Sequence, residues 1–279
     1  MLVVLVSAVA APAWAQSVAT EAEREALRGV PDRWGFNVGS FWQTFDANVR
    51  LDASVGETGT EIDLEADPRL PENQVNLVVA GFYRFSARHQ VHLSYVGWSR
   101  SRSTTIERQI EWGDVIYDVG LTVSSDESGK MLNGVYKYSF FNNGNVVFGL
   151  NGGVSCLRSD TTLSGEGRIA GGGTASATLS ESLSTTVPVP LVGAHFEMTL
   201  TKRLFWKAQG NYFAATISGY DGSLSQIETS VAYYFNPNFG VRAGFYATNY
   251  RIEKSGRAGG DYLVKYGFGG PVVEAVFTF

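Results

Sequence analysis

The sequence predicts an all-β fold, namely a closed antiparallel transmembrane β-barrel of about ten strands, with 8 and 12 strands as the alternatives. Three observations lead to this prediction. An apolar N-terminal stretch ends in small residues, long segments alternate apolar with polar residues, and tight turns alternate with long polar loops. The composition agrees, because only 18% of the residues are charged, 13% are aromatic, and no apolar run after the N-terminus is long enough for a transmembrane helix.

The N-terminus predicts export from the cell. Residues 1–15 carry no charge, have an apolar centre and end in Ala13-Trp14-Ala15, which has the form of a signal-peptide cleavage site. A basic N-terminal region is missing, which we explain by a start codon placed too late. We expect a signal peptide over 1–15, a periplasmic N-terminal segment over 16–33 and a transmembrane barrel over 34–279. The single cysteine, Cys156, excludes an internal disulfide.

The alternating segments number ten, and an even number places both chain ends on the same, periplasmic side. Tight turns rich in Asn, Gly or Pro are expected near 86–89, 142–145, 201–203 and 236–238. Long polar loops are expected near 54–73, 104–127 and 160–184, with shorter ones near 218–223 and 253–260. The expected strands are 34–52, 74–86, 89–103, 127–141, 145–159, 185–200, 203–217, 223–236, 238–252 and 261–279.

Three features orient the apolar strand faces toward lipid and the polar faces toward the lumen. Aromatic residues gather beside the tight turns, as in the interfacial girdle of membrane barrels. Charged residues lie in mid-strand, where a dry protein core would make them costly. The chain ends in an alternating stretch with Phe277 and Phe279, which is similar to the C-terminal strand that the outer-membrane barrel-assembly machinery recognises. Closure is expected because an unpaired strand edge is costly in hydrocarbon.

The polar strand faces define a set of candidate lumen residues of mixed charge. A barrel of this size is barely wider than its side chains, so we expect ion pairs and hydrogen bonds to fill the lumen. The alternative is a narrow passive channel for small polar solutes, with a weak preference for anions. The lumen-facing candidates are Arg84, His92, Arg100, Lys137, His195, Glu197, Lys207, Gln209, Asn211, Glu228, Arg242 and Glu274.

The histidines give little support for catalysis. His92 and Ser94 are similar to a His-x-Ser pair of outer-membrane lipid A deacylases, but an inward-facing pair cannot reach a lipid. His195 stands beside Glu197, with no third ligand or nucleophile. Omptin-type proteases also have ten strands, yet they carry a histidine and acidic residues at the outer rim, whereas all three histidines here map near tight turns. We expect no enzyme, catalytic residue, metal site or cofactor, with a lipid- or protein-modifying hydrolase as the last alternative.

The first two long loops are acidic, and the third is rich in Gly, Ser and Thr. The acidic loops predict a solvated surface, or one that meets lipopolysaccharide phosphates through divalent cations. The third loop, Gly165 to Ser184, predicts a flexible segment. A formal net charge of −5 argues against nucleic acid as a partner. The acidic residues are Glu57, Glu61, Asp63, Glu65, Asp67 and Glu72 in the first loop, and Glu107, Glu111, Asp114, Asp118, Asp126 and Glu127 in the second.

Four stretches carry a resemblance: Phe45–Arg50, Gly59–Glu65, Glu111–Asp114 and Tyr220–Leu224. They are similar to an uncharacterised porin-like family of proteobacterial outer-membrane β-barrel proteins. The resemblance implies location in the cell outer membrane, contact with outer-membrane lipid and lipopolysaccharide, and the barrel-assembly machinery as a partner during insertion. Barrels of this class have many roles. We expect a structural or surface-interaction barrel with a side-chain-filled lumen, and keep the small channel as the alternative.

Overall fold

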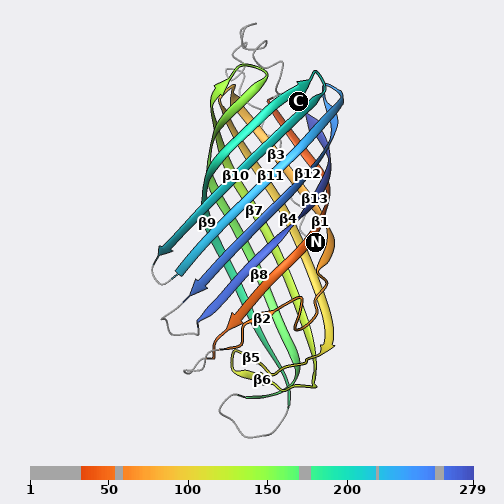
Figure 1. The fold of residues 1–279 in the computed structure, drawn as a ribbon, viewed down its shortest axis with the longest axis vertical. Helices are drawn as coiled ribbons and strands as arrows, with labels where there is room; N and C mark the ends of the chain where they lie inside the picture. The colour runs from red at the N-terminus through yellow and green to blue at the C-terminus, as the bar shows by residue number, and fades with distance from the viewer. Residues whose placement is uncertain (1–32, 54–58, 170–176, 218–219, 255–260) are drawn as a thin grey trace, which may run out of the picture.

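The computed structural model describes residues 33–53, 59–169, 177–217, 220–254 and 261–279 (Figure 1). The expected signal peptide over 1–15 lies outside these residues, as does the segment 16–33 apart from Arg33. The described part of the chain contains no helix of the length and apolar character that a membrane span requires.

Ten long antiparallel strands form the barrel wall, and their bounds confirm the predicted all-β fold with about ten strands. Three short strands of the described chain lie beyond the wall at one end: β2 (Ile62–Asp63), β5 (Ile110–Trp112) and β6 (Val115–Tyr117). The wall strands are β1 (Trp34–Leu51), β3 (Asn73–Ser86), β4 (His89–Thr105), β7 (Thr122–Asn142), β8 (Val146–Ile169), β9 (Ala177–Thr201), β10 (Leu204–Ile217), β11 (Tyr220–Asn236), β12 (Phe239–Lys254) and β13 (Tyr262–Thr278).

The prediction of a long loop over 160–184 is wrong. β8 continues to Ile169 and β9 begins at Ala177, and the two remain paired in one unbroken register up to Gly167 and Ala177. Sequence alternation failed to reveal this because serine and threonine replace apolar residues on the outward face. The predicted loop over 104–127 likewise contains β5, β6 and the first residues of β7. The run Gly171-Gly172-Gly173 lies outside the described residues.

The two ends of the barrel differ, and the C-terminal residues close it. The tight turns gather at one end, which we call the short-turn end, and the extended hairpins at the other, the long-hairpin end (Figure 1). Strand β1 pairs with β13 along nearly its whole length. At the short-turn end the backbones of Trp34 and Phe279 exchange hydrogen bonds of 3.1 and 2.8 Å, and their rings stack with centroids 4.5 Å apart. Phe36 and Phe277 stack beside them at 4.8 Å.

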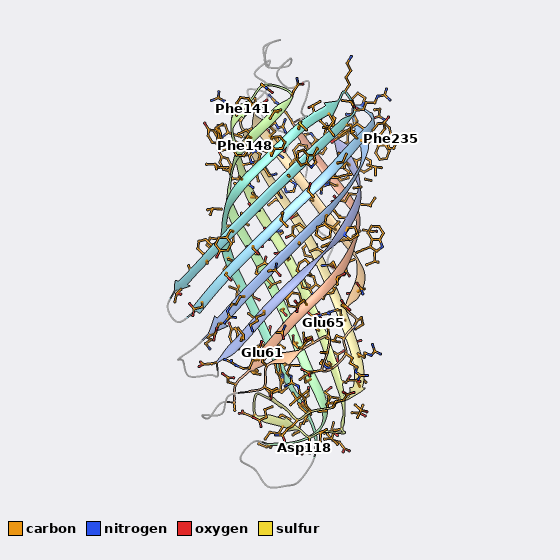
Figure 2. All side chains as sticks on the ribbon, in the orientation of Figure 1. Glu61, Glu65, Asp118, Phe141, Phe148 and Phe235 are labelled. Carbon is orange, nitrogen blue, oxygen red and sulfur yellow. The ribbon has the colours of Figure 1, made fainter. Side chains whose placement is uncertain are left out.

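The outward face of each wall strand is apolar toward the short-turn end and polar toward the long-hairpin end. We call the first zone the apolar belt and the second the polar skirt; Figure 2 shows aromatic and acidic side chains at opposite ends. Belt residues are Trp42, Leu77, Leu93, Leu132, Leu150, Val192, Tyr212, Ile227, Phe245 and Val273, all exposed. Skirt residues at the corresponding outward positions are Asp46, Asn73, Ser101, Asp126, Asp160, Ser182, Thr216, Ser223, Arg251 and Lys265.

Strand β7 shows that the inward face reverses in the opposite sense. Within the belt its outward residues include Leu132 and Tyr136, while Asn133 and Lys137 are buried inside. Within the skirt, the polar residue Asp126 is exposed on the outward face, whereas the apolar residue Val123 is buried on the inward face. On β7 the belt spans Leu132 to Phe140, which at about 3.3 Å per residue and about 40° of tilt covers roughly 20 to 25 Å. That height matches the hydrocarbon layer of a membrane.

The skirt therefore encloses an apolar core, as a water-soluble β-barrel does. Buried aromatic side chains from β1, β4 and β13 pack together there: Trp98 stacks on Tyr266 with centroids 5.4 Å apart and lies 5.0 Å from Phe268. The β5–β6 hairpin covers this core at the long-hairpin end. Its Trp112 and Tyr117 are fully buried, and the Tyr117 hydroxyl donates to the Leu163 carbonyl at 2.9 Å. Burial raises the pKa of Tyr117 to about 12.

The belt and skirt predict opposite responses to an added charge on one strand. Leu150→Arg on β8 places a cation in the apolar belt, and we expect it to lower the free energy of unfolding by about 2 kcal/mol, since a charge on the lipid-facing side is costly within the hydrocarbon layer. Ser164→Arg, on the same outward face within the skirt, should change it by less than about 0.5 kcal/mol. Urea unfolding of protein reconstituted in lipid vesicles measures both variants, and equal losses would contradict the assigned belt.

Candidate functional site inside the barrel

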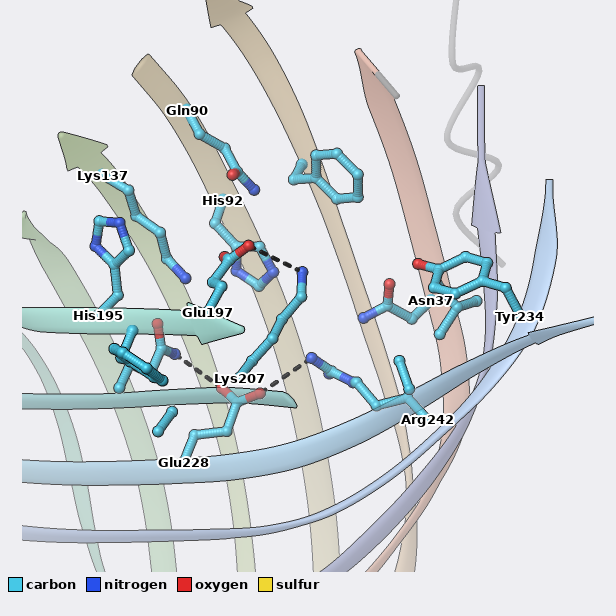
Figure 3. A pocket seen from close by; sticks show the side chains of 16 residues that line it. Asn37, Gln90, His92, Lys137, His195, Glu197, Lys207, Glu228, Tyr234 and Arg242 are labelled. Carbon is cyan, nitrogen blue, oxygen red and sulfur yellow. Dashed lines mark hydrogen bonds and ion pairs between the residues drawn. The ribbon is translucent and has the colours of Figure 1, made fainter. Parts of the chain in front are cut away.

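The interior enclosed by the apolar belt holds a cluster of charged side chains (Figure 3). Strands β7, β9, β10, β11 and β12 each contribute one charged residue whose side chain points inward, because inward positions alternate with the lipid-facing residues. Lys137, Lys207 and Arg242 point into the same space as Glu197 and Glu228 (Figure 3). Opposite charges therefore surround one small volume, which allows each to be neutralised without water.

Ion pairs link most of this cluster across neighbouring strands. Arg242 Nη1 lies 3.0 Å from Glu228 Oε1, and its Nε donates to Glu274 Oε2 at 2.6 Å. Lys207 Nζ lies 3.7 Å from Glu197 Oε2. Gln209 also donates to Glu228, at 2.8 Å. The side chain of Glu274 is fully buried, so removal of its cationic partner would leave an uncompensated carboxylate.

Two small cavities remain between these side chains. One, of about 40 Å³, is lined by His92, Lys137, His195 and their charged neighbours. The other, of about 60 Å³, lies next to it and is lined by Ser94, Asn211, Glu274 and apolar residues. A buried water occupies roughly 10 to 15 Å³ on this measure, so each cavity has room for only a few waters.

A second polar network connects His195 to the neighbouring strands. His195 Nδ1 lies 2.7 Å from Asn151 Oδ1, and His195 Nε2 lies 3.1 Å from Ser139 Oγ. The amide nitrogen of Asn151 donates to two carbonyl oxygens, those of Asn211 (3.0 Å) and Ala194 (3.2 Å). Asn151 Oδ1 is therefore an acceptor, so His195 carries its proton on Nδ1 and accepts from Ser139 through Nε2.

This order of hydroxyl and imidazole is similar to the arrangement that activates a serine nucleophile, with the Asn151 amide where such enzymes have a carboxylate. The three side chains are almost completely buried, however, and neither interior cavity is lined by Ser139. No space for an acyl substrate adjoins the hydroxyl in either cavity. Sequence reasoning did not connect Ser139 and Asn151 to His195, because only the pairing of β7, β8 and β9 brings these residues together.

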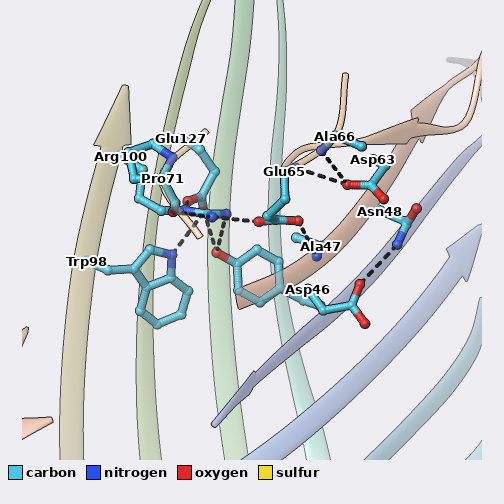
Figure 4. Close-up of polar contacts among 11 residues, drawn as sticks. Asp46, Ala47, Asn48, Asp63, Glu65, Ala66, Pro71, Trp98, Arg100 and Glu127 are labelled. Carbon is cyan, nitrogen blue, oxygen red and sulfur yellow. Dashed lines mark hydrogen bonds and ion pairs between the residues drawn. The ribbon is translucent and has the colours of Figure 1, made fainter. Parts of the chain in front are cut away.

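A separate cluster surrounds Arg100 in the core of the skirt (Figure 4). Arg100 Nε donates to Glu127 Oε2 at 2.9 Å, and Nη1 donates to Glu65 Oε1 at 2.5 Å. Trp98 Nε1 and the Tyr266 hydroxyl both donate to the other Glu127 oxygen, each at 2.9 Å. Burial raises the pKa of the Glu127 carboxyl, although the Arg100 guanidinium favours its charged form. One arginine thus joins β4, β7 and the β2–β3 connection.

The interpretation of the acidic loops as uniformly solvated needs correction. Glu65 and Glu127 are interior partners of Arg100, because β7 begins earlier than predicted and the chain after β2 turns inward. Other loop carboxylates also form ion pairs: Asp67 with Arg108 and Glu107 with Arg69 (2.5 Å) join two loops, and Glu61 pairs with Lys265 of β13 at 2.6 Å. In the described residues, no three His, Cys, Asp or Glu side chains are arranged to hold a metal ion.

The structure places the predicted lumen residues in two groups. Of the twelve predicted residues, Arg100 is the one that lies in the skirt. The other eleven lie in the belt interior, where Arg84 approaches the cavity-lining Gln90 at 3.4 Å. The three histidines also lie toward the short-turn end: His89 follows a tight turn, and the inward-facing His92 and His195 line the smaller cavity. The long-hairpin end has no histidine.

Comparisons with known proteins agree on the architecture. No protein-family model and no curated protein matches the sequence. The crystal structure of the outer membrane protease OmpT from Escherichia coli superposes with a TM-score of 0.55 at 12% identity, covering 90% of this chain and 98% of that chain. The fold is that of outer-membrane β-barrel proteins. At such low identity the likeness to OmpT concerns the fold alone.

Two other outer-membrane barrels superpose less well. The Pseudomonas putida toluene transporter TodX gives a TM-score of 0.38 at 8% identity, over 91% of this chain and 92% of that chain. Ail, the attachment invasion locus protein of Yersinia pestis, gives 0.31 at 10% identity, over 89% of this chain and 100% of that chain.

The buried pairs predict an asymmetry between two glutamates. Glu274→Gln removes one of the two carboxylates that Arg242 contacts in the belt interior and leaves Arg242 with Glu228 alone, and we expect it to lower the free energy of unfolding by about 2 kcal/mol. Glu253→Gln breaks the exposed Arg251–Glu253 pair of 2.8 Å and should cost less than about 1 kcal/mol. Denaturant unfolding of both variants in the same detergent checks this. Similar losses would mean that the interior is wet enough to screen its charges.

Proposed function

We propose that this chain is an integral outer-membrane β-barrel that is closed to solutes and has a structural or surface-interaction role. We place it in the outer membrane, exported by a cleaved signal peptide, with both termini periplasmic and the long hairpins outside the cell. The observation that carries the proposal is the layered interior. Ion pairs fill the belt interior, an aromatic core fills the skirt, and the β5–β6 hairpin covers that core.

The polar skirt supports a role at the cell surface. A barrel that served only to cross the membrane has no use for strands that continue far past the hydrocarbon, since the belt alone satisfies every backbone group there. Strands β7, β8 and β9 remain paired well beyond the belt, and their outward faces there carry polar side chains. Its contacts with outer-membrane lipid and lipopolysaccharide, and its insertion by the barrel-assembly machinery, belong to this proposal.

Electrical recording separates the closed barrel from the small-channel alternative. Purified protein reconstituted in a planar bilayer should give no steady openings, because the interior cavities of about 40 and 60 Å³ admit only a few waters. Vesicles that contain it should swell in an isotonic sugar solution no faster than empty vesicles. An open porin, reconstituted in parallel, is the positive control. Reproducible unitary conductance or accelerated swelling would replace this proposal with a porin-like channel.

We also propose that the chain is not an enzyme, which the Ser139–His195–Asn151 network makes testable. Folded protein incubated with a fluorophosphonate probe should remain unlabelled, because Ser139 is buried and adjoins neither interior cavity. A known serine hydrolase in the same detergent is the positive control. Labelling that disappears in Ser139→Ala, but persists in Ser155→Ala, would instead establish an activated serine inside the barrel.

A further inference from the structure

Two neighbouring wall strands separate at the long-hairpin end. β9 and β10 pair from the turn between them as far as Val192 and Tyr212, and in the described residues their pairing stops there. Both strands continue past this point, β9 back to Ala177 and β10 on to Ile217, each paired with its other neighbour. Figure 1 shows β9 running on alongside β8 while β10 ends well short of it. The wall therefore has a notch between two strand edges.

The alternating direction of backbone hydrogen bonds along β9 identifies the amides that face this notch. In an antiparallel pair, a residue directs both its N–H and its C=O toward the same neighbour, and successive residues alternate. The Thr199 N–H donates to Asn145 on the β8 side at 2.8 Å, so odd-numbered residues of β9 bond to β8. Pro188 and Pro190, which have no N–H, are even-numbered as this requires. The notch-facing amides are those of Thr178, Ser180, Ser182, Ser184 and Thr186.

This edge is open, in contrast to the other edge of the extended sheet. All five residues are exposed, and their N–H groups have no protein acceptor in the described part of the chain. On the opposite side β4 loses its β3 partner beyond Val96, but there the Gln74 side chain donates to the Ser99 carbonyl at 2.8 Å. A long strand edge with free amides readily accepts another strand. Only the part nearest the belt is blocked, by the two prolines.

We propose that the notch binds an extended peptide segment of another protein, which adds to β9 as a further antiparallel strand. This proposal rests on the surface-interaction role and names the partner's chemistry. Inward side chains of the added strand would lie beside Leu179 and Leu183, which favour apolar residues, and beside Glu181 between them, which also accepts a basic residue. Outward side chains would lie beside hydroxyl groups, with Glu166 on one flank and Asp221 on the other, which favours Lys or Arg. The expected partner is an alternating apolar and basic segment without proline.

A second copy of this chain in the same membrane fits the notch poorly. Two barrels inserted in the same direction are related by an axis along the membrane normal. That axis keeps both β9 strands pointing the same way with opposite tilts, so at about 40° of tilt the two edges cross at roughly 80°. They cannot run side by side over five amides. An unconnected peptide has no such restriction.

Hydrogen exchange of the free protein tests the edge itself. In detergent micelles, residue-resolved NMR should show fast exchange at Ser180, Ser182 and Ser184 and slow exchange at Leu179, Glu181 and Leu183, since only the second group bonds to β8. Slow exchange at all six amides would mean that the chain covers its own edge, and fast exchange at all six would mean that the hairpin frays. Either result overturns the proposal.

A synthetic nonapeptide of alternating valine and lysine tests the binding. With valines facing inward, the lysine amides bond to β9, so N-methylation of the lysines should abolish the fluorescence-anisotropy signal, whereas N-methylation of the valines should preserve it. Ser182→Pro removes one edge donor without touching the β8 ladder, and should weaken binding about fivefold to tenfold. Ser182→Ala keeps that donor and should stay within about twofold. Slow exchange at the odd-numbered amides verifies that Ser182→Pro is folded.

Three outcomes overturn the proposal: no binding of the unmodified peptide, binding that ignores lysine N-methylation, or equal affinities of Ser182→Pro and Ser182→Ala. A dimer in analytical ultracentrifugation that Ser182→Pro dissociates would assign the edge to a second copy instead. These results are independent of the conductance measurement. A conducting barrel that binds the peptide would refute the closed lumen and support the binding edge. A non-conducting barrel that does not bind the peptide would support the closed lumen and refute the binding edge.

Discussion

The medium outside the barrel changes from hydrocarbon to water part-way along each strand, and this boundary governs the rest of the structure. Leu132 and Asp126 lie on the same outward face of β7, on opposite sides of it. Because a strand alternates its side chains, the interior must change in the opposite sense. Charged side chains, which are costly in lipid, face inward within the belt, whereas apolar side chains, which are unfavourable in water, face inward within the skirt.

The two interiors are stabilised by different interactions. In the belt interior, Arg242 contacts both Glu228 and Glu274, and the loss of this arginine would leave the fully buried Glu274 carboxylate without its cationic partner. In the skirt, burial of Phe45, Trp98 and Phe268 supplies the ordinary hydrophobic contribution, and the Arg100 guanidinium lies 4.1 Å from the centre of the Phe45 ring. The belt interior thus depends on matched charges, and the skirt interior on the burial of apolar side chains away from water.

The sequence predicted the wall better than the hairpins, for a physical reason. The outward face of the belt must be apolar, so strands such as Phe239–Lys254 were located to within about two residues. Beyond the belt the outward face meets water, so Ser180, Ser182 and Ser184 on β9 carry no alternation of hydropathy and were taken as loop. The lumen candidates followed from the same alternation. Their partners did not, because register decides that Glu127 meets Arg100 and that Asn151 meets His195.

The Arg100 cluster also bears on how the cylinder assembles. Arg100 and Glu127 come from consecutive wall strands, but the tyrosine that shares Glu127 with them, Tyr266, belongs to the last strand, 139 positions away from Glu127 in the chain. Its hydroxyl lies beside Glu127 only where β13 is paired with β1, so this long-range contact depends on closure of the barrel. The aromatic stacking of Trp98 on Tyr266 arises in the same step, so the indole fluorescence carries an intrinsic signal of ring completion.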